Sequence, residues 1–545
     1  MLLTPALLTL LVPQTPAQVP AARPAAAPER RISSIQVGEH SFLSRRLDNG
    51  LRAFAVRDAA EDAEGRASIF VVVSAGNRDE SVETTGLAHL TEHALYTGTA
   101  KTGDDEHDRI VMKELGGESN ASTRDDYTIY YDHRIPAEAL PRVLAMEADR
   151  MANLIWDEPA VLHERERLRI EERNTWNPSI SRQELLEFAV YQQEGYRYGR
   201  RDEQGHTKAP GLGMDLIREF YETWYRPEHT AVLVVTPNDP AQALDQIEEA
   251  FGAWQGKPGI ELPPRKREGK PFGPRTRRFE SGLAQDRVEL CWVVPARTHA
   301  DTASLAVLAR LLDRLKTSAG EPFQVSFHER QGSGLFRIAA NGPTAAAELE
   351  ALLERLREMG PAAEQVADAK REERDRYSSL PLRARPYFSM AAEVARYGVY
   401  GEHGLLEAWP KLVDAVDRES VHRAAKQHLD PKTRVMVHFT ATEDAEAARE
   451  LPADTKALAQ FAQDAGEAGE YELAVAAYTE LLNRNPNRMN TVIYLATRGQ
   501  LHMDHEDWDA AIQDFEEALT VVDYPAVREM LKEAQRRKAE AGGGR

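Results

Sequence analysis

The stretch Gly86–Gly98 carries two histidines and a glutamate at a spacing that could bind and use a metal ion. Its interior holds neither proline nor glycine, and apolar residues recur at helical spacing, which predicts a short helix ending near Gly98. His89 and His93 are four residues apart, so both imidazoles lie on one face and can share a tetrahedral zinc ion. Glu92 shares that face and can reach a water on the metal without being a ligand, as a general base must.

The pentapeptide His89–His93 does not establish a metal site by itself. With 16 histidines and 88 acidic residues in the chain, a His-x-x-acid-His pattern arises by chance with a probability of about 0.08. A zinc hydrolase also needs a third protein ligand and an open position for water. The glutamates of 164–173 are candidates, but a run so rich in Glu and Arg is usually the solvated face of a helix. From residue types alone, Glu171 is one candidate among several.

The composition is that of an ordinary globular chain and excludes several classes of function. A length of 545 residues is too great for one core and predicts several domains. The net charge of −20 argues against nucleic acid or an anionic membrane as a partner. The single cysteine, Cys291, excludes an internal disulfide, and its apolar neighbours predict a buried strand residue.

The N-terminus predicts export. Residues 1–12 form a short apolar run, and a segment rich in proline and alanine follows over 13–28. The run is too short to span a membrane and is typical of a signal-peptide core, although no basic residue precedes it. We therefore expect residues 1–30 to be a signal and Pro/Ala-rich segment of a periplasmic or extracellular protein, with a cytoplasmic location as the alternative. No other stretch is apolar enough to span a membrane.

The pattern along residues 31–450 predicts an α+β fold of two similar domains, 31–260 and 276–450, joined by a Pro/Gly-rich linker at 261–275. In the first domain, Asp48-Asn49-Gly50 is a hairpin signal, and residues 119–126 are predicted to be a turn. Strands are expected near 68–74, 127–131 and 230–236, and helices near 107–115, 137–151, 159–175, 214–225 and 241–254. In the second domain, strands are expected near 287–294, 323–327, 334–339 and 434–439, and helices near 302–315, up to about 376, and at 387–400.

Residues 455–545 carry a repeated set of aromatic and alanine residues. The repeated positions are Tyr471, Ala474 and Tyr478, then Trp508, Ala511 and Phe515. The displacement of 37 residues is close to the tetratricopeptide period of about 34. The region therefore resembles a tetratricopeptide array with a closing helix at 525–540, in which these residues pack and a groove is open to a protein partner.

The stretch from Gly86 to Thr99 closely resembles the inverted zinc motif of the pitrilysin/insulinase metallopeptidases. In that family the third ligand is a glutamate in a downstream Glu-Arg-x-x-apolar-x-x-Glu helix, and 164–171 fits that spelling. The resemblance implies zinc held by His89, His93 and Glu171, with Glu164 supporting catalysis from beside the ligands. Moving the register by one residue would make Glu172 the ligand instead.

The resemblance extends to a substrate-binding strand and to the whole two-domain body. Asn120 and Ala121 lie in a stretch that resembles the family's Gly-Gly-x-x-Asn-Ala-x-Thr strand, which adds an extended peptide to the edge of a sheet. The likeness covers about residues 35–445 and implies half of a clam-shell chamber, each domain a mainly antiparallel sheet backed by helices. It implies a zinc endopeptidase acting on peptides or unfolded segments.

One departure from the family concerns an Arg/Tyr pair, seven residues apart, that contacts the substrate carbonyl. The corresponding positions here hold Lys316 and Phe323. Phenylalanine has no hydroxyl to donate, and lysine lacks the planar fork of arginine. We therefore hypothesise that this chain is the zinc-bearing subunit of a pair, whose second peptidase-like subunit is the same or a different chain. The alternatives are a weakly active or inactive processing-complex subunit, and a binding protein that acts through residues 455–545.

Overall fold

The structure is a computed structural model, and it describes most of the chain in segments. The described residues are 32–58, 65–103, 105–175, 178–191, 207–263, 274–281, 286–317, 320–321, 323–342, 344–382, 389–441, 451, 454–467, 471–484, 488–505, 507–521 and 525–542. The expected signal segment and most of the expected linker lie outside them. Within them, no helix combines the length and the apolar character needed to span a membrane.

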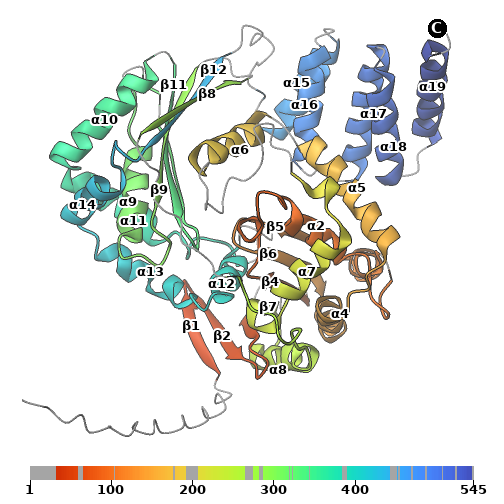
Figure 1. The fold of residues 1–545 in the computed structure, drawn as a ribbon, viewed down its shortest axis with the longest axis horizontal. Helices are drawn as coiled ribbons and strands as arrows, with labels where there is room; N and C mark the ends of the chain where they lie inside the picture. Colours follow the sequence, from red (N-terminus) through yellow and green to blue (C-terminus); the bar gives the residue numbers. More distant parts are fainter. Residues whose placement is uncertain are drawn as a thin grey trace, which may run out of the picture.

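The first domain is built on a sheet in which the described strands follow the order β1-β2-β3-β7-β4-β6-β5 (Figure 1). The bounds are β1 Ser33–Val37, β2 His40–Arg46, β3 Arg52–Arg57, β4 Arg66–Val73, β5 Glu118–Thr123, β6 Thr128–Pro136 and β7 Thr230–Thr236. The predicted hairpin at Asp48-Asn49-Gly50 joins β2 to β3, and Gly50 has the positive φ of 95° that this turn needs. β5 is an edge strand, so one of its sides is open to a further strand.

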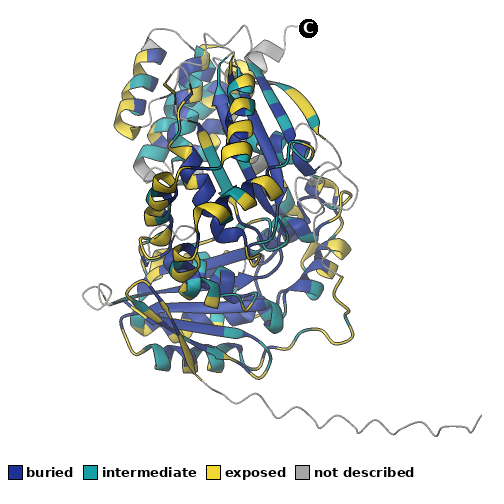
Figure 2. Ribbon diagram, turned by 90° about the vertical axis from the view of Figure 1, so that its left-hand side faces the viewer, coloured by how far each residue is buried: buried dark blue, intermediate teal, exposed yellow. Residues whose placement is uncertain are grey.

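Both faces of this sheet are covered, which explains the continuous apolar runs of its central strands. Helices of the first domain cover one face: α2 Leu87–Ala94, α4 Leu140–Ala152, α7 Met214–Trp224 and α8 Pro240–Phe251. The other face packs against the second domain, so one apolar cluster runs from Phe54 and Phe70 into Val394 and Leu290. Figure 2 shows the strands buried beneath helices whose outer faces are exposed.

The second domain repeats the strand connectivity of the first. Its sheet has the order β10-β11-β9-β12-β8, which matches β5-β6-β4-β7-β3 strand for strand along the chain. The bounds are β8 Arg275–Ser281, β9 Arg287–Val294, β10 Gln324–His328, β11 Gly334–Asn341 and β12 Val435–Ala441. Cys291 is fully buried in β9, as predicted. The prediction of two similar α+β domains is confirmed.

Both sheets are mainly antiparallel, as predicted, and each also contains one parallel pair. β3 pairs with β7 and β8 pairs with β12 in parallel, while the other pairings are antiparallel. Each parallel pair joins strands far apart in the sequence, and local patterns carry no information about such partners. The sequence pattern therefore did not identify these two parallel pairs.

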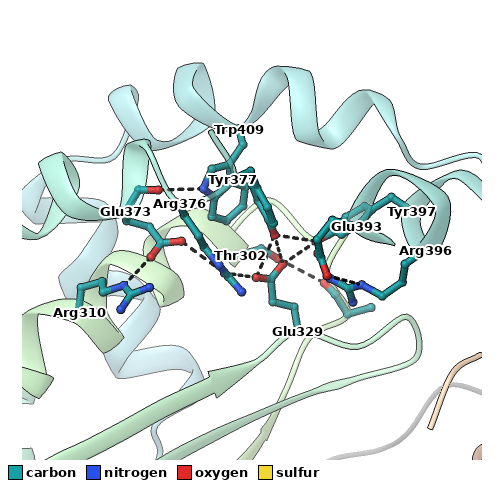
Figure 3. A network of polar contacts seen from close by, with 11 residues as sticks. Thr302, Arg310, Glu329, Glu373, Arg376, Tyr377, Glu393, Arg396, Tyr397 and Trp409 are labelled. Carbon is teal, nitrogen blue, oxygen red and sulfur yellow. Dashed lines mark hydrogen bonds and ion pairs between the residues drawn. The ribbon is translucent and has the colours of Figure 1, made fainter. Parts of the chain in front are cut away.

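Helices and a buried polar network complete the second domain. Its helices are α9 Thr302–Asp313, α10 Ala345–Met359, α11 Ala363–Arg374, α12 Met390–Gly398, α13 Gly404–Asp414 and α14 Arg418–His428. Glu329 accepts hydrogen bonds from Arg376 and from the hydroxyls of Tyr377 and Tyr397 (Figure 3). Helix α12 packs on the first domain, where a Cβ at Gly398 would lie 2.5 Å from the ring of Phe54.

Five helices follow the second domain in the described C-terminal residues: α15 Thr455–Glu467, α16 Tyr471–Asn483, α17 Arg488–Asp504, α18 Trp508–Val521 and α19 Pro525–Gly542. Each packs against the next along the chain (Figure 1). Ala474, Tyr478, Ala511 and Phe515 are buried between them, as expected of packing residues. The helical character of this region agrees with the prediction; its assignment to the tetratricopeptide class stays a prediction.

One local prediction was wrong, one predicted helix differs in helix type, and several elements were not predicted. Residues 119–126, predicted as a turn, include most of strand β5, because its Ser/Asn/Thr composition hides a strand that is stabilised by pairing with β6. The predicted helix at 107–115 is a short α-helix, α3 Glu106–Asp108, followed by a π-helix at Arg109–Glu114. Helices α6 Pro178–Tyr191, α13 and α14, and strands β1 and β8, were not predicted.

Candidate metal centre

Helix α2, which carries both predicted histidine ligands, is held at its N-terminus by a buried carboxylate and a glycine. Glu80 accepts hydrogen bonds from the backbone amides of Gly86 (2.9 Å) and Ala88 (2.7 Å), so it caps the helix and complements its dipole. Gly86 has a φ of 88°, and a Cβ there would lie 2.6 Å from the hydroxyl of Thr207. Another residue at position 86 would therefore displace the start of α2.

The structure brings His89, His93 and Glu171 together, although Glu171 comes from a distant helix, α5 Glu158–Thr175. His93 Nε2 lies 3.3 Å from Glu171 Oε2, and His89 Nε2 lies 3.8 Å from Glu171 Oε1. Donors around a tetrahedral zinc ion lie about 3.4 Å apart. Two imidazole nitrogens and one carboxylate at this spacing are a donor set that zinc accepts, and the residues present fit that metal.

Glu164 lies beside the donor set and orients one of its imidazoles. Its Oε2 lies 2.9 Å from Nδ1 of His93, on the ring edge opposite the Nε2 that faces Glu171. Arg167 donates to the other oxygen of Glu164 at 2.7 Å, and the Glu164 side chain is 4% exposed. A carboxylate in this position fixes the ring and its tautomer and makes Nε2 a better donor to a metal.

The predicted general base, Glu92, is buried at the base of the same helix face. Thr123 of β5 donates a hydrogen bond of 2.5 Å to Glu92 Oε2, which leaves the other oxygen available to a second partner. Burial raises the pKa of Glu92 to about 7, although the Thr123 hydroxyl and His93 act in the opposite direction. A carboxyl whose pKa lies near neutrality can accept and return a proton at the pH at which cells operate.

The charges around the donor set favour a cation. Burial lowers the pKa of His93, but hydrogen bonds to Glu164 and Glu171 outweigh it and raise that pKa to about 9. The pKa of Glu171 is lowered, chiefly by its hydrogen bond with His93. Three carboxylates thus surround two imidazoles, and the cluster gains most when a positive charge, a proton or a metal ion, lies among them.

The edge strand β5 lies next to α2, where a substrate-binding strand was expected. Asn120 is exposed and its side-chain oxygen accepts from the amide of Ala121 at 2.8 Å, while Ala121 is 7% exposed and packs inward. Among the described strands β5 pairs only with β6, so its other edge can accept an extended peptide.

The remaining sequence candidates fall outside this cluster. The Glu172 side chain lies outside the described residues, so the register alternative stays open. Lys316 is exposed, whereas Phe323 is 4% exposed and packs in the core of the second domain. Phe323 therefore offers nothing to a substrate.

Glu80 and the role of Thr123 were missed by sequence reasoning. Thr123 is part of the stretch that resembles Gly-Gly-x-x-Asn-Ala-x-Thr, so the sequence marked this residue. It did not indicate that Thr123 would bind Glu92. Glu80 lies six residues before Gly86, and no local capping pattern points to it because its carboxylate reaches the helix through a loop.

Comparison with known proteins identifies the class of domain that holds this cluster. Residues 58–200 match the family described as insulinase (peptidase family M16), and residues 212–373 match the M16 peptidase inactive domain. The body of the chain is therefore a pair of pitrilysin/insulinase-like M16 domains. The second match agrees with the absence of a second His-x-x-Glu-His from the sequence.

Individual relatives match parts of the chain, and one of them is named as a zinc protease. The chain is 29% identical to the zinc protease PqqE of Helicobacter pylori over 341 residues, which are 57% of this chain and 73% of that protein. It is 31% identical to the coenzyme PQQ synthesis protein F of Pseudomonas aeruginosa over 230 residues, 40% of this chain. That stretch spans 28% of the Pseudomonas protein.

Solved structures share the fold. A protease from Helicobacter pylori superposes with a TM-score of 0.63 at 24% identity, over 74% of this chain and all of that one. The periplasmic protease PqqL from Escherichia coli gives a TM-score of 0.62 at 18% identity, over 77% of this chain and 50% of that one.

Proposed function

We propose that this chain is a zinc-dependent endopeptidase that hydrolyses peptides or unfolded protein segments. The observation that carries the proposal is the donor set of His89, His93 and Glu171 with the buried acid Glu92 beside it. Bound zinc would lower the pKa of its water toward neutrality and polarise the scissile carbonyl. The relatives named as zinc proteases support the same class of reaction.

In this proposal each residue has a separate task. Glu92 takes a proton from the attacking water and returns it to the leaving amine, and its pKa of about 7 suits both steps. Thr123 holds the Glu92 carboxylate in one orientation, and Glu164 holds the His93 ring. The backbone around Asn120 and Ala121 binds an extended substrate along the edge of β5.

We also propose that the chain acts as the zinc-bearing subunit of a two-chain chamber. Lys316 and Phe323 stand where the family resemblance expects an Arg/Tyr pair, and the burial of Phe323 removes it from any substrate. A second subunit would then supply the groups that stabilise the oxyanion. One relative is named the beta subunit of the mitochondrial-processing peptidase, which shows that such a domain occurs within assemblies.

The test combines metal content with activity. The purified chain should contain zinc and cleave an unstructured peptide in a chelator-sensitive manner, weakly alone and strongly with a candidate partner subunit. Glu92→Gln should retain zinc and lose about 10²–10⁴-fold in cleavage rate. Exposed Glu158→Gln on α5 is the matched control. A zinc-free wild-type chain, or normal turnover after the Glu92→Gln substitution, would refute the proposal.

The weakly active or inactive subunit remains the second candidate, because Lys316 and Phe323 favour it. It predicts bound zinc without cleavage, whichever partner subunit is added.

We further propose export, on the basis of the apolar residues 1–12 and a relative described as a periplasmic protease. Fractionation of cells, with N-terminal sequencing of the mature chain, tests this point.

A further inference from the structure

Among the described residues, three clusters hold histidine and acidic groups close enough to bind one metal ion. One is the candidate metal centre. A second, composed of His107, Asp132 and Glu147, is fully buried and already contains a cation, since Arg150 forms an ion pair with Glu147 at 2.5 Å. The third lies in the second domain and consists of His299, Asp301 and His428.

We propose that His299, Asp301 and His428 form a second binding site for a divalent cation of the zinc class. His299 and Asp301 come from the loop that precedes α9, and His428 is the last residue of α14. His428 Nε2 lies 2.8 Å from Asp301 Oδ2, and His299 Nδ1 lies 3.9 Å from the same oxygen. These distances bracket the spacing of about 3.4 Å around tetrahedral zinc. The corresponding distances in the candidate metal centre are 3.3 and 3.8 Å.

The exposure of the three residues suits an ion that enters from solvent. Asp301 and His428 are buried, at 7% and 2% exposure, whereas the His299 side chain is 42% exposed. Two donors are thus fixed by packing, and the third can swing onto the ion, with water completing the coordination. His299 Nδ1 accepts a hydrogen bond of 3.1 Å from the Asp301 amide in the metal-free chain, so this bond must break before that nitrogen binds the ion.

The donor chemistry selects the class of cation. Two imidazoles and one carboxylate suit Zn²⁺, Co²⁺ or Ni²⁺, while Ca²⁺ and Mg²⁺ prefer sets of oxygens. The pKa of Asp301 is held below its usual value, because the hydrogen bond from His428 outweighs burial, so the carboxylate is ionised at neutral pH. Arg423 Nη2 lies 3.6 Å from Asp301 Oδ1 and opposes a cation, which provides a variant that should bind more tightly.

The experiment measures metal binding by the full-length chain, independently of peptide cleavage. Zinc-free wild-type, His89→Ala, His299→Ala and double-variant proteins are titrated with Zn²⁺ by calorimetry, and with Co²⁺ to record the absorption of a tetrahedral site. We expect about two ions per chain for wild type, one for each single variant and none for the double variant. Arg423→Gln in the His89→Ala background should tighten binding by up to about fivefold.

His422→Ala is the matched control, because His422 lies on α14 but contacts the Arg357 carbonyl instead of the cluster. It should leave the stoichiometry unchanged. If His89→Ala shows no saturable binding, or if its binding survives His299→Ala, the second site is refuted. A wild-type chain that binds a single ion, unaffected by His89→Ala and lost after His299→Ala, would instead contradict the proposed catalytic centre.

Discussion

At the scale of single residues, the orientation of Glu92, the proposed general base, depends on neighbouring side chains. Glu92 is placed by α2 and is held from a different element, because the Thr123 hydroxyl of β5 occupies one of its two oxygens. In a similar way, the Glu164 carboxylate of α5 holds the ring of His93 through its Nδ1. Neither supporting residue touches a substrate in the proposed reaction, yet each fixes a group that has a task in it: Thr123 fixes the general base and Glu164 fixes a metal ligand. Substitutions at both positions therefore separate orientation from chemistry.

Removing the Thr123 hydroxyl should slow turnover without loss of zinc. Thr123→Val deletes a hydrogen bond to a charged carboxylate, a change that corresponds to about tenfold or more in kcat. KM should stay close to the wild-type value, because substrate contacts are unchanged. Thr123→Ser keeps the hydroxyl and should restore kcat. Steady-state kinetics with parallel zinc analysis measures this, and equal damage by both substitutions would show that the hydroxyl is not the cause.

Neutralising Glu164 should weaken the metal centre. Glu164→Gln removes the negative charge that orients His93 and increases its basicity, so zinc affinity should fall by about 10–100-fold. Competition with a chelator of known affinity measures the change. Glu166→Gln, on an exposed position of the same helix, is the control. An unchanged affinity after the Glu164→Gln substitution would mean that His93 is held by its packing alone.

At the scale of elements, the sequence predicted those features that depend only on local pattern and spacing. The His89–His93 pair on one helix face and strands 230–236 and 287–294 follow from local periodicity. The approach of Glu171 to that pair does not, because the residues of 164–173 all look like a solvated helix face. Family resemblance supplied that expectation, and the structure shows the two helices in contact.

Two strands that depend on pairing, β5 and β8, were missed by local pattern, although the family resemblance indicated a strand at β5. Strand β5 is polar along its length and is held by pairing with β6, while β8 pairs in parallel with a strand that begins 160 residues later. Tertiary pairing overrides weak local preference in both cases. The cap that Glu80 provides for α2 was missed for a similar reason, because the path of the loop between Glu80 and α2 brings the carboxylate to the helix.

The buried network around Glu329 should make the stability of the second domain depend on pH. Burial acts to raise the pKa of Glu329, but Arg376, Arg396 and the Tyr397 hydroxyl outweigh it and hold the pKa below the usual 4.5. Its contribution is therefore complete above pH 4.5 and is lost as the pH falls below that value.

Glu329→Gln should destabilise the chain at neutral pH by about 3 kcal/mol, because it removes the closer of the two buried carboxylates that pair with Arg376 and leaves only Glu373, at 3.3 Å. The difference from wild type should shrink as the pH falls below 4.5. Urea unfolding at several pH values measures it, and Glu419→Gln, an exposed position on α14, should have an effect of less than about 0.5 kcal/mol. A difference that does not vary with pH would show that the pKa of Glu329 is the same in the folded and unfolded chains, which contradicts the prediction.

At the scale of the whole molecule, the two sheets share one connectivity but only the first carries the donor set. α2 and α9 occupy equivalent places in the two domains, each between the strands equivalent to β4 and β5, and α9 is buried along its length where α2 presents two histidines. The M16 inactive-domain match, over residues 212–373, begins in the last elements of the first domain and covers the second domain as far as α11. One domain is therefore equipped for chemistry, while its counterpart supplies packing and the second proposed cation site.

The C-terminal helices should be dispensable for peptide hydrolysis. Helices α15–α19 pack mainly on one another, so deletion of residues 455–545 should leave zinc content and the cleavage of a short peptide by the assembled enzyme unchanged. Capture of a protein partner should be lost instead. Peptide assays and pull-downs of the truncated and full-length chains measure both effects. A truncated chain that keeps its zinc but no longer cleaves would assign these helices to the catalytic assembly.

Glu171 contributes its carboxylate from a side chain that is 51% exposed, whereas both histidines stand on a helix anchored at its start. The imidazole pair would therefore already be in place when an ion arrives, whereas the glutamate side chain can move onto it. Metal binding would then link α5 to α2, and amide hydrogen exchange in α5 would become slower when the ion is bound. Chelation would release that helix and, with it, one wall of the space beside the edge strand.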